Sequence, residues 1–257
     1  MLEDRLKTIQ HYLYAHGSSS IETLVEHLGA SPATVRRDLA RLEELGVIER
    51  THGGARLATS SGLEAAFSVR EHERLEAKRA IARAAYAHLM PGSTVLMDAG
   101  TTVLQLARLI HLNPMRLTVI TNGLALAQEL VGLSEVEIIT IGGRLRADNL
   151  SSVGPYAEAA LREFWCDQLF LGATAINRDG LMLTLDADEA AINRRMLERA
   201  EERFLLADSS KFGHRAPYRV AALEQVTRII SDTDLDAQWL ERLKEHEIVL
   251  ERAEVKK

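Results

Sequence analysis

The chain has 257 residues, of which 46% are hydrophobic and 26% are charged, and this size and composition predict a folded protein with two domains. Its formal net charge of −6 argues against nucleic-acid binding only for the surface as a whole, because only the face that meets DNA has to be basic. The single cysteine, Cys166, excludes an internal disulfide and a cysteine-based metal cluster. No stretch is long and apolar enough for a membrane helix, and the charged N-terminal segment is unlike a signal peptide, so we expect a cytoplasmic protein.

Three helices and a hairpin are predicted over residues 1–58. Apolar residues at helical spacing indicate a first helix, and a capping box at 19–22 begins a short second helix that Gly29 ends. A third helix is predicted over 31–45, because Ser31 is a good N-cap and a proline follows it at the first helical position. Two short strands then flank the glycine-containing turn 51–54. This order is typical of a winged helix-turn-helix.

The third helix has one apolar and one basic face. Val35, Leu39 and Leu42 recur at helical spacing and form the apolar stripe, whereas Arg37 and Arg41 point away from it. A basic helix face that follows a short capped helix is typical of a helix that enters the major groove of DNA. The residues that we predict to contact DNA are Ser31, Ala33, Thr34, Arg36, Arg37, Arg41, Arg50 and His52.

These arginines also have a plainer interpretation, in which they solvate the helix or pair with Asp38 and Glu43. Two capped helices joined by a short turn, followed by a glycine-tipped hairpin, favour DNA binding instead. Thr34 and Arg37 are the best candidates to reach base edges or phosphates. Asp38 is more typical of an intramolecular anchor for an arginine than of a base contact.

The rest of the chain shows a different pattern. Residues 59–77 lack a clear apolar period until about Leu75 and are predicted to be a linker between a DNA-binding domain at 1–58 and an effector-sensing domain at 78–257. In the second domain, short apolar runs alternate with helical segments, which predicts a mostly parallel sheet with helices on both faces, that is, an α/β fold. The predicted strands are 93–98, 117–121, 136–141, 168–171, 203–207 and 226–231, and the predicted helices are 102–112, 123–131, 154–164 and 186–200.

Polar and glycine-rich turns follow several of these strands. Ligands of open α/β sheets bind at the carboxyl ends of the strands, where such turns converge. The turn at 100–102 begins a helix and offers N–H groups and hydroxyls that suit an anion such as phosphate, and the other turns add cations and groups that can hold sugar hydroxyls. We therefore predict a phosphorylated sugar or polyol as the effector. The candidate effector-binding residues are Asp98, Gly100, Thr101, Thr102, Thr121, Asn122, Gly143, Arg144, Gly172, Glu189 and Lys211.

Each of these turns also has a structural interpretation. The segment 100–102 can be a tight turn with a helix cap, the pair 142–143 can allow a sharp exit from a strand, and Glu189 suits the acidic first turn of a helix. Their shared location at strand ends favours a ligand site. No phosphate-loop or dinucleotide fingerprint and no metal-ligand spacing occurs, so we predict no catalytic residue, no cofactor and no metal.

The chain as a whole resembles the DeoR family of bacterial transcriptional regulators. The resemblance implies a winged helix-turn-helix joined to an effector domain similar to ribose-5-phosphate isomerase. It also implies repression of sugar-catabolism genes that a phosphorylated sugar relieves. One departure is the segment 174–177, Thr-Ala-Ile-Asn, where family members often have Gly then Asp. The matching motifs are Ser-x-x-Thr-Val-Arg-Arg-Asp-Leu at 31–39, His52-Gly53-Gly54-Ala55, Asp98-x-Gly-Thr-Thr, Thr121-Asn122, Gly142-Gly143, Phe170-Leu171-Gly172, Glu189 and Asp208-Ser-Ser-Lys-Phe-Gly.

Two other functions stay open from the residues alone. A sugar-phosphate isomerase with an accessory N-terminal domain would need a general base, for which Asp98 and Glu189 are the candidates. A protein-interaction module would use the N-terminal helices for docking, which their basic outer face disfavours. We predict a DNA-binding repressor of carbohydrate-catabolism genes, a homo-oligomer whose partners are double-stranded operator DNA and the phosphorylated effector, with no membrane contact.

Overall fold

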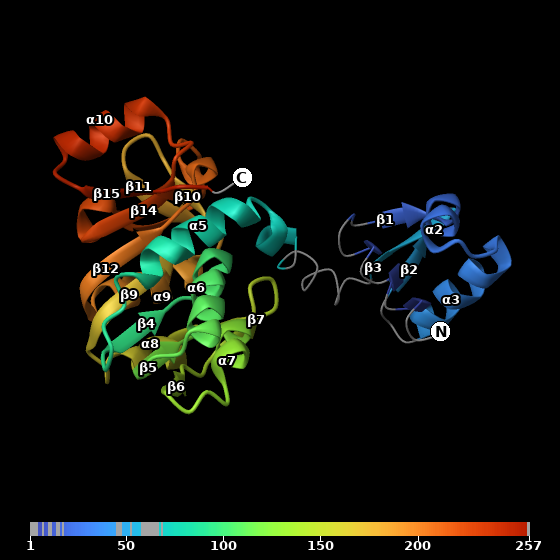
Figure 1. Ribbon diagram of the computed structural model, residues 1–257, viewed down its shortest axis with the longest axis horizontal. Helices are drawn as coiled ribbons and strands as arrows, with labels where there is room; N and C mark the ends of the chain where they lie inside the picture. Colours follow the sequence, from blue (N-terminus) through green and yellow to red (C-terminus); the bar gives the residue numbers. More distant parts are fainter. Residues whose placement is uncertain are drawn as a thin grey trace. The chain divides into compact units, whose positions relative to one another are not determined.

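The computed structural model divides the chain into two compact units (Figure 1). The N-terminal unit comprises Met1–Glu73 with Ala147–Asn149, and the C-terminal unit comprises Arg74–Arg146 with Leu150–Lys257. Helix α5 (Leu75–Tyr86) begins inside the segment predicted as the linker, and the domain bounds 1–58, 59–77 and 78–257 stay a prediction. The structure describes residues 5–6, 8–9, 12–13, 16, 18–44, 48–51, 53–57, 67 and 69–255.

The N-terminal unit combines helices with a small antiparallel sheet in the order β1-β3-β2. The described residues between 5 and 16 are helical, in agreement with the predicted first helix. The predicted hairpin is confirmed as β2 and β3, whereas β1 was not predicted. The elements are β1 (Ser18–Ser20), α2 (Ile21–Leu28), α3 (Pro32–Glu44), β2 (Ile48–Thr51) and β3 (Gly54–Leu57).

Local signals set the ends of α2 and α3. The hydroxyl oxygen of Ser20 accepts a backbone N–H of the first turn of α2 at 3.1 Å, so the helix begins one residue later than a cap at Ser19 predicts. Gly29 ends α2 in the left-handed conformation at φ 59°, which glycine adopts without strain. The Ser31 hydroxyl accepts the Thr34 N–H at 3.2 Å and confirms the predicted cap of α3.

The core of the N-terminal unit draws on the first helical segment, on α2 and α3, and on the hairpin strands β2 and β3. Val35, Leu39 and Leu42 of α3 are fully buried, as the apolar stripe predicted. Because this stripe takes one side of α3, the opposite side is left to solvent. The other buried residues of this core are Ile9, Leu13, Ile21, Leu24, Ile48 and Ala55.

The C-terminal unit is built on a seven-stranded sheet, parallel throughout, in the order β15-β14-β12-β9-β4-β5-β6. All six predicted strands belong to this sheet. The helix predicted over 186–200 is too long, because β12 already begins at Ala200. The strands are β4 (Thr94–Met97), β5 (Leu117–Thr121), β6 (Val136–Thr140), β9 (Cys166–Gly172), β12 (Ala200–Leu206), β14 (Arg228–Asp232) and β15 (Val249–Ala253).

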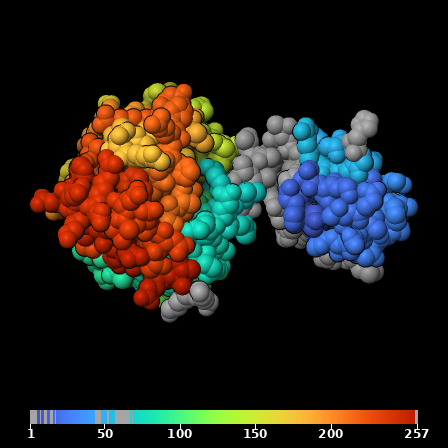
Figure 2. Space-filling view, turned by 90° about the horizontal axis from the view of Figure 1, so that it is seen from above, coloured from blue at the N-terminus to red at the C-terminus, as the bar shows by residue number. Residues whose placement is uncertain are grey.

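Helices cover both faces of this sheet, as predicted. Strand residues alternate between two cores: Val95 and Met97 of β4 pack on the face of α5, α6 and α7, whereas Leu96 packs on the face of α8, α9 and α10. Figure 2 shows the C-terminal residues, coloured red, gathered on one face of this unit. The remaining helices are α6 (Thr101–Leu112), α7 (Leu124–Leu130), α8 (Pro155–Leu161), α9 (Ala187–Leu197) and α10 (Ala237–Glu245).

Several short elements were not predicted, because strands of two to five residues between turns show little periodicity. They make a three-stranded sheet in the order β10-β11-β13 and a hairpin of β7 and β8. The short elements are β7 (Arg144–Arg146), β8 (Ser151–Val153), β10 (Ala175–Ile176), β11 (Leu181–Thr184), β13 (Tyr218–Ala222) and the 3₁₀ turns η1 (Ser209–Lys211) and η2 (Leu223–Gln225).

In the part of the chain that the structure describes, no helix is long and apolar enough to cross a membrane.

Candidate functional site

The outer face of α3 is polar and basic. Arg36, Arg37 and Arg41 are exposed on α3, and Arg50 is exposed on β2. The exposed Ser31 and Ala33 and the half-buried Thr34 form the N-terminal turn of the helix. The Ser31 and Thr34 hydroxyl oxygens lie 2.9 Å apart, which fixes both side chains at the end of the helix.

A buried carboxylate anchors α3 from its inner side. Asp38 is 2% exposed and accepts two bonds from the Arg5 guanidinium, one of them Nη2–H to Oδ1 at 3.0 Å. This bidentate pair confirms the prediction that Asp38 anchors an arginine. The sequence did not identify Arg5 as that partner, because a contact between residues 33 positions apart leaves no local signal.

The hairpin β2–β3 forms the wing. Glu49 and Arg56 pair across it, with Nε 2.8 Å from Oε2. A Cβ on Gly54 would lie 2.0 Å from the Ser19 carbonyl oxygen, so only glycine allows β3 to lie this close to β1. His52, the remaining predicted contact of the wing, lies outside the described residues.

At the other candidate site, Asp98 joins the ends of two neighbouring strands, β4 and β9. Its Oδ1 accepts the Gly100 N–H at 2.9 Å and its Oδ2 accepts the Gly172 N–H at 3.0 Å. Burial raises the pKa of Asp98 to about 7, although the two N–H partners favour the charged form, and the Glu189 charge adds to the increase. The structure therefore brings these four predicted residues together.

The turn after β5 is the second part of this arrangement. The Thr121 hydroxyl accepts the Gly123 N–H at 3.0 Å, and the Asn122 amide donates to the Ser152 carbonyl oxygen of β8 at 3.0 Å. Asn122 is 4% exposed, and its Oδ1 has no hydrogen-bond partner among the residues that the structure describes. A buried acceptor without a donor is costly, so this oxygen is suited to a donor supplied from outside the chain.

Helix α6 begins at this same turn. Gly100 is its N-cap, and glycine has no side chain that could cap the helix. Thr101 is half-buried and Thr102 is buried. The helix end has the polarity that a phosphate needs.

The charged residues of this site pair differently from what the sequence indicated. Glu189 accepts a bond from Arg146 Nη1 at 2.5 Å, and Arg146 is only 8% exposed. Arg146, the buried cation of this site, was not predicted from the sequence. Arg144 instead pairs with Asp188 at the exposed rim. Within the described residues, no hydrogen bond or ion pair joins Arg144 or Lys211 to the Asp98 turn.

Gly143 has a packing role. A Cβ there would lie 2.7 Å from the Val153 carbonyl oxygen, so glycine lets β7 meet β8. Gly172 and Glu189 border a cavity of about 10 Å³, roughly the room for one water molecule. The side of the site that Gly172 and Glu189 form is thus closely packed.

A larger cavity, of about 640 Å³, opens after β12 and β14, and no predicted effector residue lines it. Its volume is in the usual range for small-molecule sites. Ser209 and Ser210, next to Lys211, were the available sequence signal for it. The cavity is lined by Arg74, Arg178, Ser209, Ser210, Phe212, Gly213, Asp234, Leu235, Asp236, Gln238, Trp239 and Arg242.

Family models match most of the chain. The DeoR-like helix-turn-helix domain matches residues 5–61, and the DeoR C terminal sensor domain matches residues 73–233. The protein belongs to the DeoR family of DNA-binding transcriptional regulators.

Curated relatives match along almost their whole length. The HTH-type transcriptional regulator GlpR of Haloferax volcanii is 39% identical over 241 residues, covering 94% of this chain and 94% of that protein. The glycerol-3-phosphate regulon repressor of Escherichia coli K12 is 34% identical over 235 residues, covering 91% and 92%. Among solved structures, ribose 5 phosphate isomerase A from Neisseria gonorrhoeae is similar with a TM-score of 0.39 and 13% identity, over 54% of this chain and 53% of that chain.

Proposed function

We propose that this regulator is a repressor of carbohydrate-catabolism genes, and that a phosphorylated sugar or polyol releases it from operator DNA. The observation that supports this most directly is the arginine face of α3, which is exposed on a unit that matches the DeoR-like helix-turn-helix. The names of its relatives, which include a glycerol-3-phosphate regulon repressor, support the effector class.

In this proposal α3 enters the major groove with Thr34 and Arg37 nearest the base edges. Arg36, Arg41 and Arg50, with Ser31, Ala33 and His52, contact phosphates or lie against the groove. A homo-oligomer, a dimer or tetramer, would place two such helices in successive grooves. Analytical ultracentrifugation of the full chain measures the oligomeric state. The protein would act in the cytoplasm, where the chromosome lies.

Arg37→Ala tests the DNA site. We expect it to weaken binding to DNA from the flanks of the gene by about tenfold or more, because a charge-assisted contact to a base or phosphate is lost. Fluorescence anisotropy at fixed physiological salt measures the affinity, since salt alone changes it strongly.

The control is Arg162→Ala, which removes an exposed arginine of the C-terminal unit and should leave the affinity unchanged. Unchanged affinity in Arg37→Ala as well would remove Arg37 from the DNA site.

The effector would bind at the start of α6. Its phosphate would accept N–H groups of the first turn of α6 and the Thr101 hydroxyl, the Asn122 Oδ1 would accept a sugar hydroxyl, and Lys211 would add positive charge. Release from DNA requires that the effector prefer the conformation that binds DNA weakly.

Thr101→Val tests this effector site. We expect a protein that binds operator DNA normally but is released less readily by glycerol 3-phosphate or hexose phosphates in the anisotropy assay. A normal release by the same compounds would contradict the assignment of Thr101.

We also propose that the protein is not an isomerase. Both candidate bases are already engaged, since Asp98 accepts two backbone N–H groups and Glu189 pairs with Arg146. A general base has to reach a substrate proton. Turnover of pentose or hexose phosphates by the purified protein above the uncatalysed rate would contradict this.

A further inference from the structure

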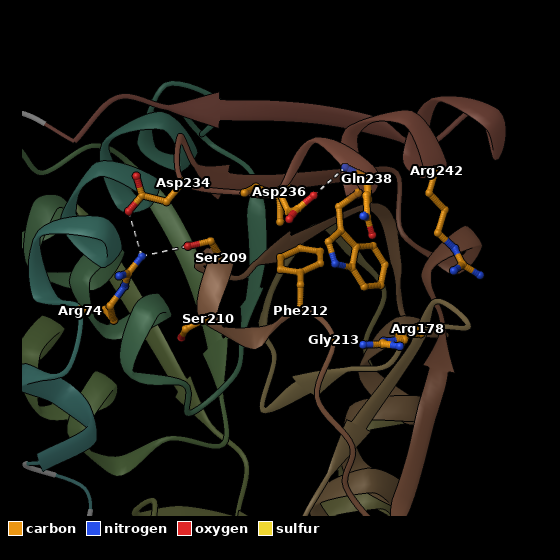
Figure 3. Close-up of a pocket in the computed structure, with 12 residues that line it drawn as sticks. Arg74, Arg178, Ser209, Ser210, Phe212, Gly213, Asp234, Asp236, Gln238 and Arg242 are labelled. Atoms are coloured by element: carbon orange, nitrogen blue, oxygen red, sulfur yellow. Dashed lines mark hydrogen bonds and ion pairs between the residues drawn. The ribbon is translucent and has the colours of Figure 1, made fainter.

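The 640 Å³ cavity is lined by Arg178 and Arg242, which lie on one side of Phe212 (Figure 3), and by the aromatic pair of Phe212 and Trp239. We propose that it is a second ligand site, separate from the turns around Asp98, and that it binds a phosphomonoester whose body has a flat apolar face. This goes beyond the proposed function, which assigns only the strand-end turns.

The arginines supply the anion-binding end. Arg178 and Arg242 both line the cavity, and among the described residues neither makes an ion pair. Figure 3 shows them on the same side of Phe212. Guanidinium groups without a carboxylate partner are suited to a phosphate, which they bind through paired N–H donors.

The chain holds Arg178 in place through a tight turn. Asn177 Oδ1 accepts the N–H of Asp179 at 3.0 Å and the N–H of Leu181 at 2.9 Å, and Gly180 completes the turn with φ at +76°. Asn177 closes the segment 174–177. Asn177 therefore shapes the turn that presents this arginine.

The aromatic pair offers an apolar surface. The Phe212 and Trp239 rings meet edge to face, with centroids 5.1 Å apart, and the Arg242 guanidinium lies 5.7 Å from the centre of the Trp239 ring. Phe212 is 7% exposed and so is held in place by the core. A nucleobase or the C–H face of a sugar can pack against such a surface.

The opposite wall is held in a fixed arrangement and is not neutral, because one cation, Arg74, faces two carboxylates, Asp232 and Asp234. Arg74 donates to Ser209 Oγ at 2.9 Å and to Asp234 Oδ2 at 3.2 Å, and it lies 3.8 Å from the fully buried Asp232. Arg74 also has a positive φ of 53°, which this set of contacts holds in place. Because the charge of Arg74 is already paired with carboxylates, the anion would bind at the end of the cavity that Arg178 and Arg242 line.

Trp239 makes this proposal directly testable. The chain has two tryptophans, and Trp165 is 65% exposed away from the cavity lining. In full-length Trp165→Phe, the fluorescence of Trp239 reports on the cavity. Titrations with adenosine 5′-monophosphate, glucose 6-phosphate and inorganic phosphate separate a flat base, a sugar face and the anion alone.

We expect a saturable fluorescence change with one of the two phosphomonoesters, and affinity about tenfold weaker or more in Arg178→Ala and in Arg242→Ala. Thr101→Val, in the proposed effector site, should leave the titration unchanged. No saturable change with any probe would overturn the proposal. So would binding in both arginine variants that is as tight as in Trp165→Phe alone. So would inorganic phosphate binding as tightly as the esters. Failure of the proposed function appears separately, as a normal release of Thr101→Val from DNA.

Discussion

Two regions at the same edge of one sheet use polar groups in opposite ways. After β4 and β9, the polar groups bind one another: Asp98 accepts two backbone N–H groups, and Glu189 accepts a hydrogen bond from Arg146. After β12 and β14, a cavity of about 640 Å³ opens, and Arg178 and Arg242 have no carboxylate partner among the residues described. Most of the recognisable motifs mark the packed region, whereas the open volume follows the next two strands of the sheet and is bordered by only one of these motifs, Asp208-Ser-Ser-Lys-Phe-Gly.

The difference shows that a polar motif does not by itself indicate an open site. Buried polar side chains have to be satisfied, so a motif rich in carboxylates and glycines is also what closely packed strand ends require. Open volume depends on which elements cover the strand ends. Here the cover of the second region includes α10, which the sequence pattern did not predict.

Arg146→Ala should have the largest effect and would test the packed region. Because it leaves Glu189, 19% exposed, without its partner, we expect a loss of about 3–5 kcal/mol in the unfolding free energy of the C-terminal unit. Urea denaturation followed by circular dichroism measures it.

Arg144→Ala is the matched control, because the Arg144–Asp188 pair is 61% and 43% exposed. Its loss should cost less than about 1 kcal/mol. Equal costs for the two variants would mean that the region around Glu189 is not packed as the structure has it.

The pH dependence of stability gives the second test. Asp98 has a pKa of about 7 in the folded protein against 3.8 for the free group, so between these values the folded state holds a proton that the unfolded state has lost. The contribution of Asp98 to stability therefore falls as pH rises from about 4 to 7, by about 1.4 kcal/mol per pH unit. Thermal melting from pH 5 to 8 checks this.

Asp98→Asn should remove this slope, at the cost of one acceptor for the N–H groups of Gly100 and Gly172. A variant that keeps the wild-type slope would assign the titration to another group.

The alternation of apolar runs and helical periods was enough to predict most of the fold. Six of the seven strands of the parallel sheet were predicted, because a parallel strand is buried on both faces and appears as a short apolar run, whereas the edge strand β15 was missed. Ser31 and Gly29 marked helix ends through local chemistry that acts within one turn. The short strands β7, β8 and β10 were missed because two or three residues are too few to show an alternating pattern.

The sequence predicted the individual turns of the site but not the contacts between them. The sequence identified the turns at Asp98 and Asn122, since both follow buried strands directly. It missed Arg146 and Arg5, whose partners Glu189 and Asp38 lie 43 and 33 positions away. Such pairings depend on how the elements pack.

Arg178→Ala should have the smallest effect on stability, and this sharpens the contrast with Arg146. Arg178 is exposed and makes no ion pair with any described residue, so its loss should change the unfolding free energy by less than about 0.5 kcal/mol. The same denaturation series measures it beside Arg146→Ala. A cost of several kcal/mol would mean that Arg178 stabilises the turn that Asn177 builds, and the two regions would then use their arginines alike. A negligible cost would mean that the Arg178 guanidinium has no part in folding, which leaves it available for the proposed ligand site.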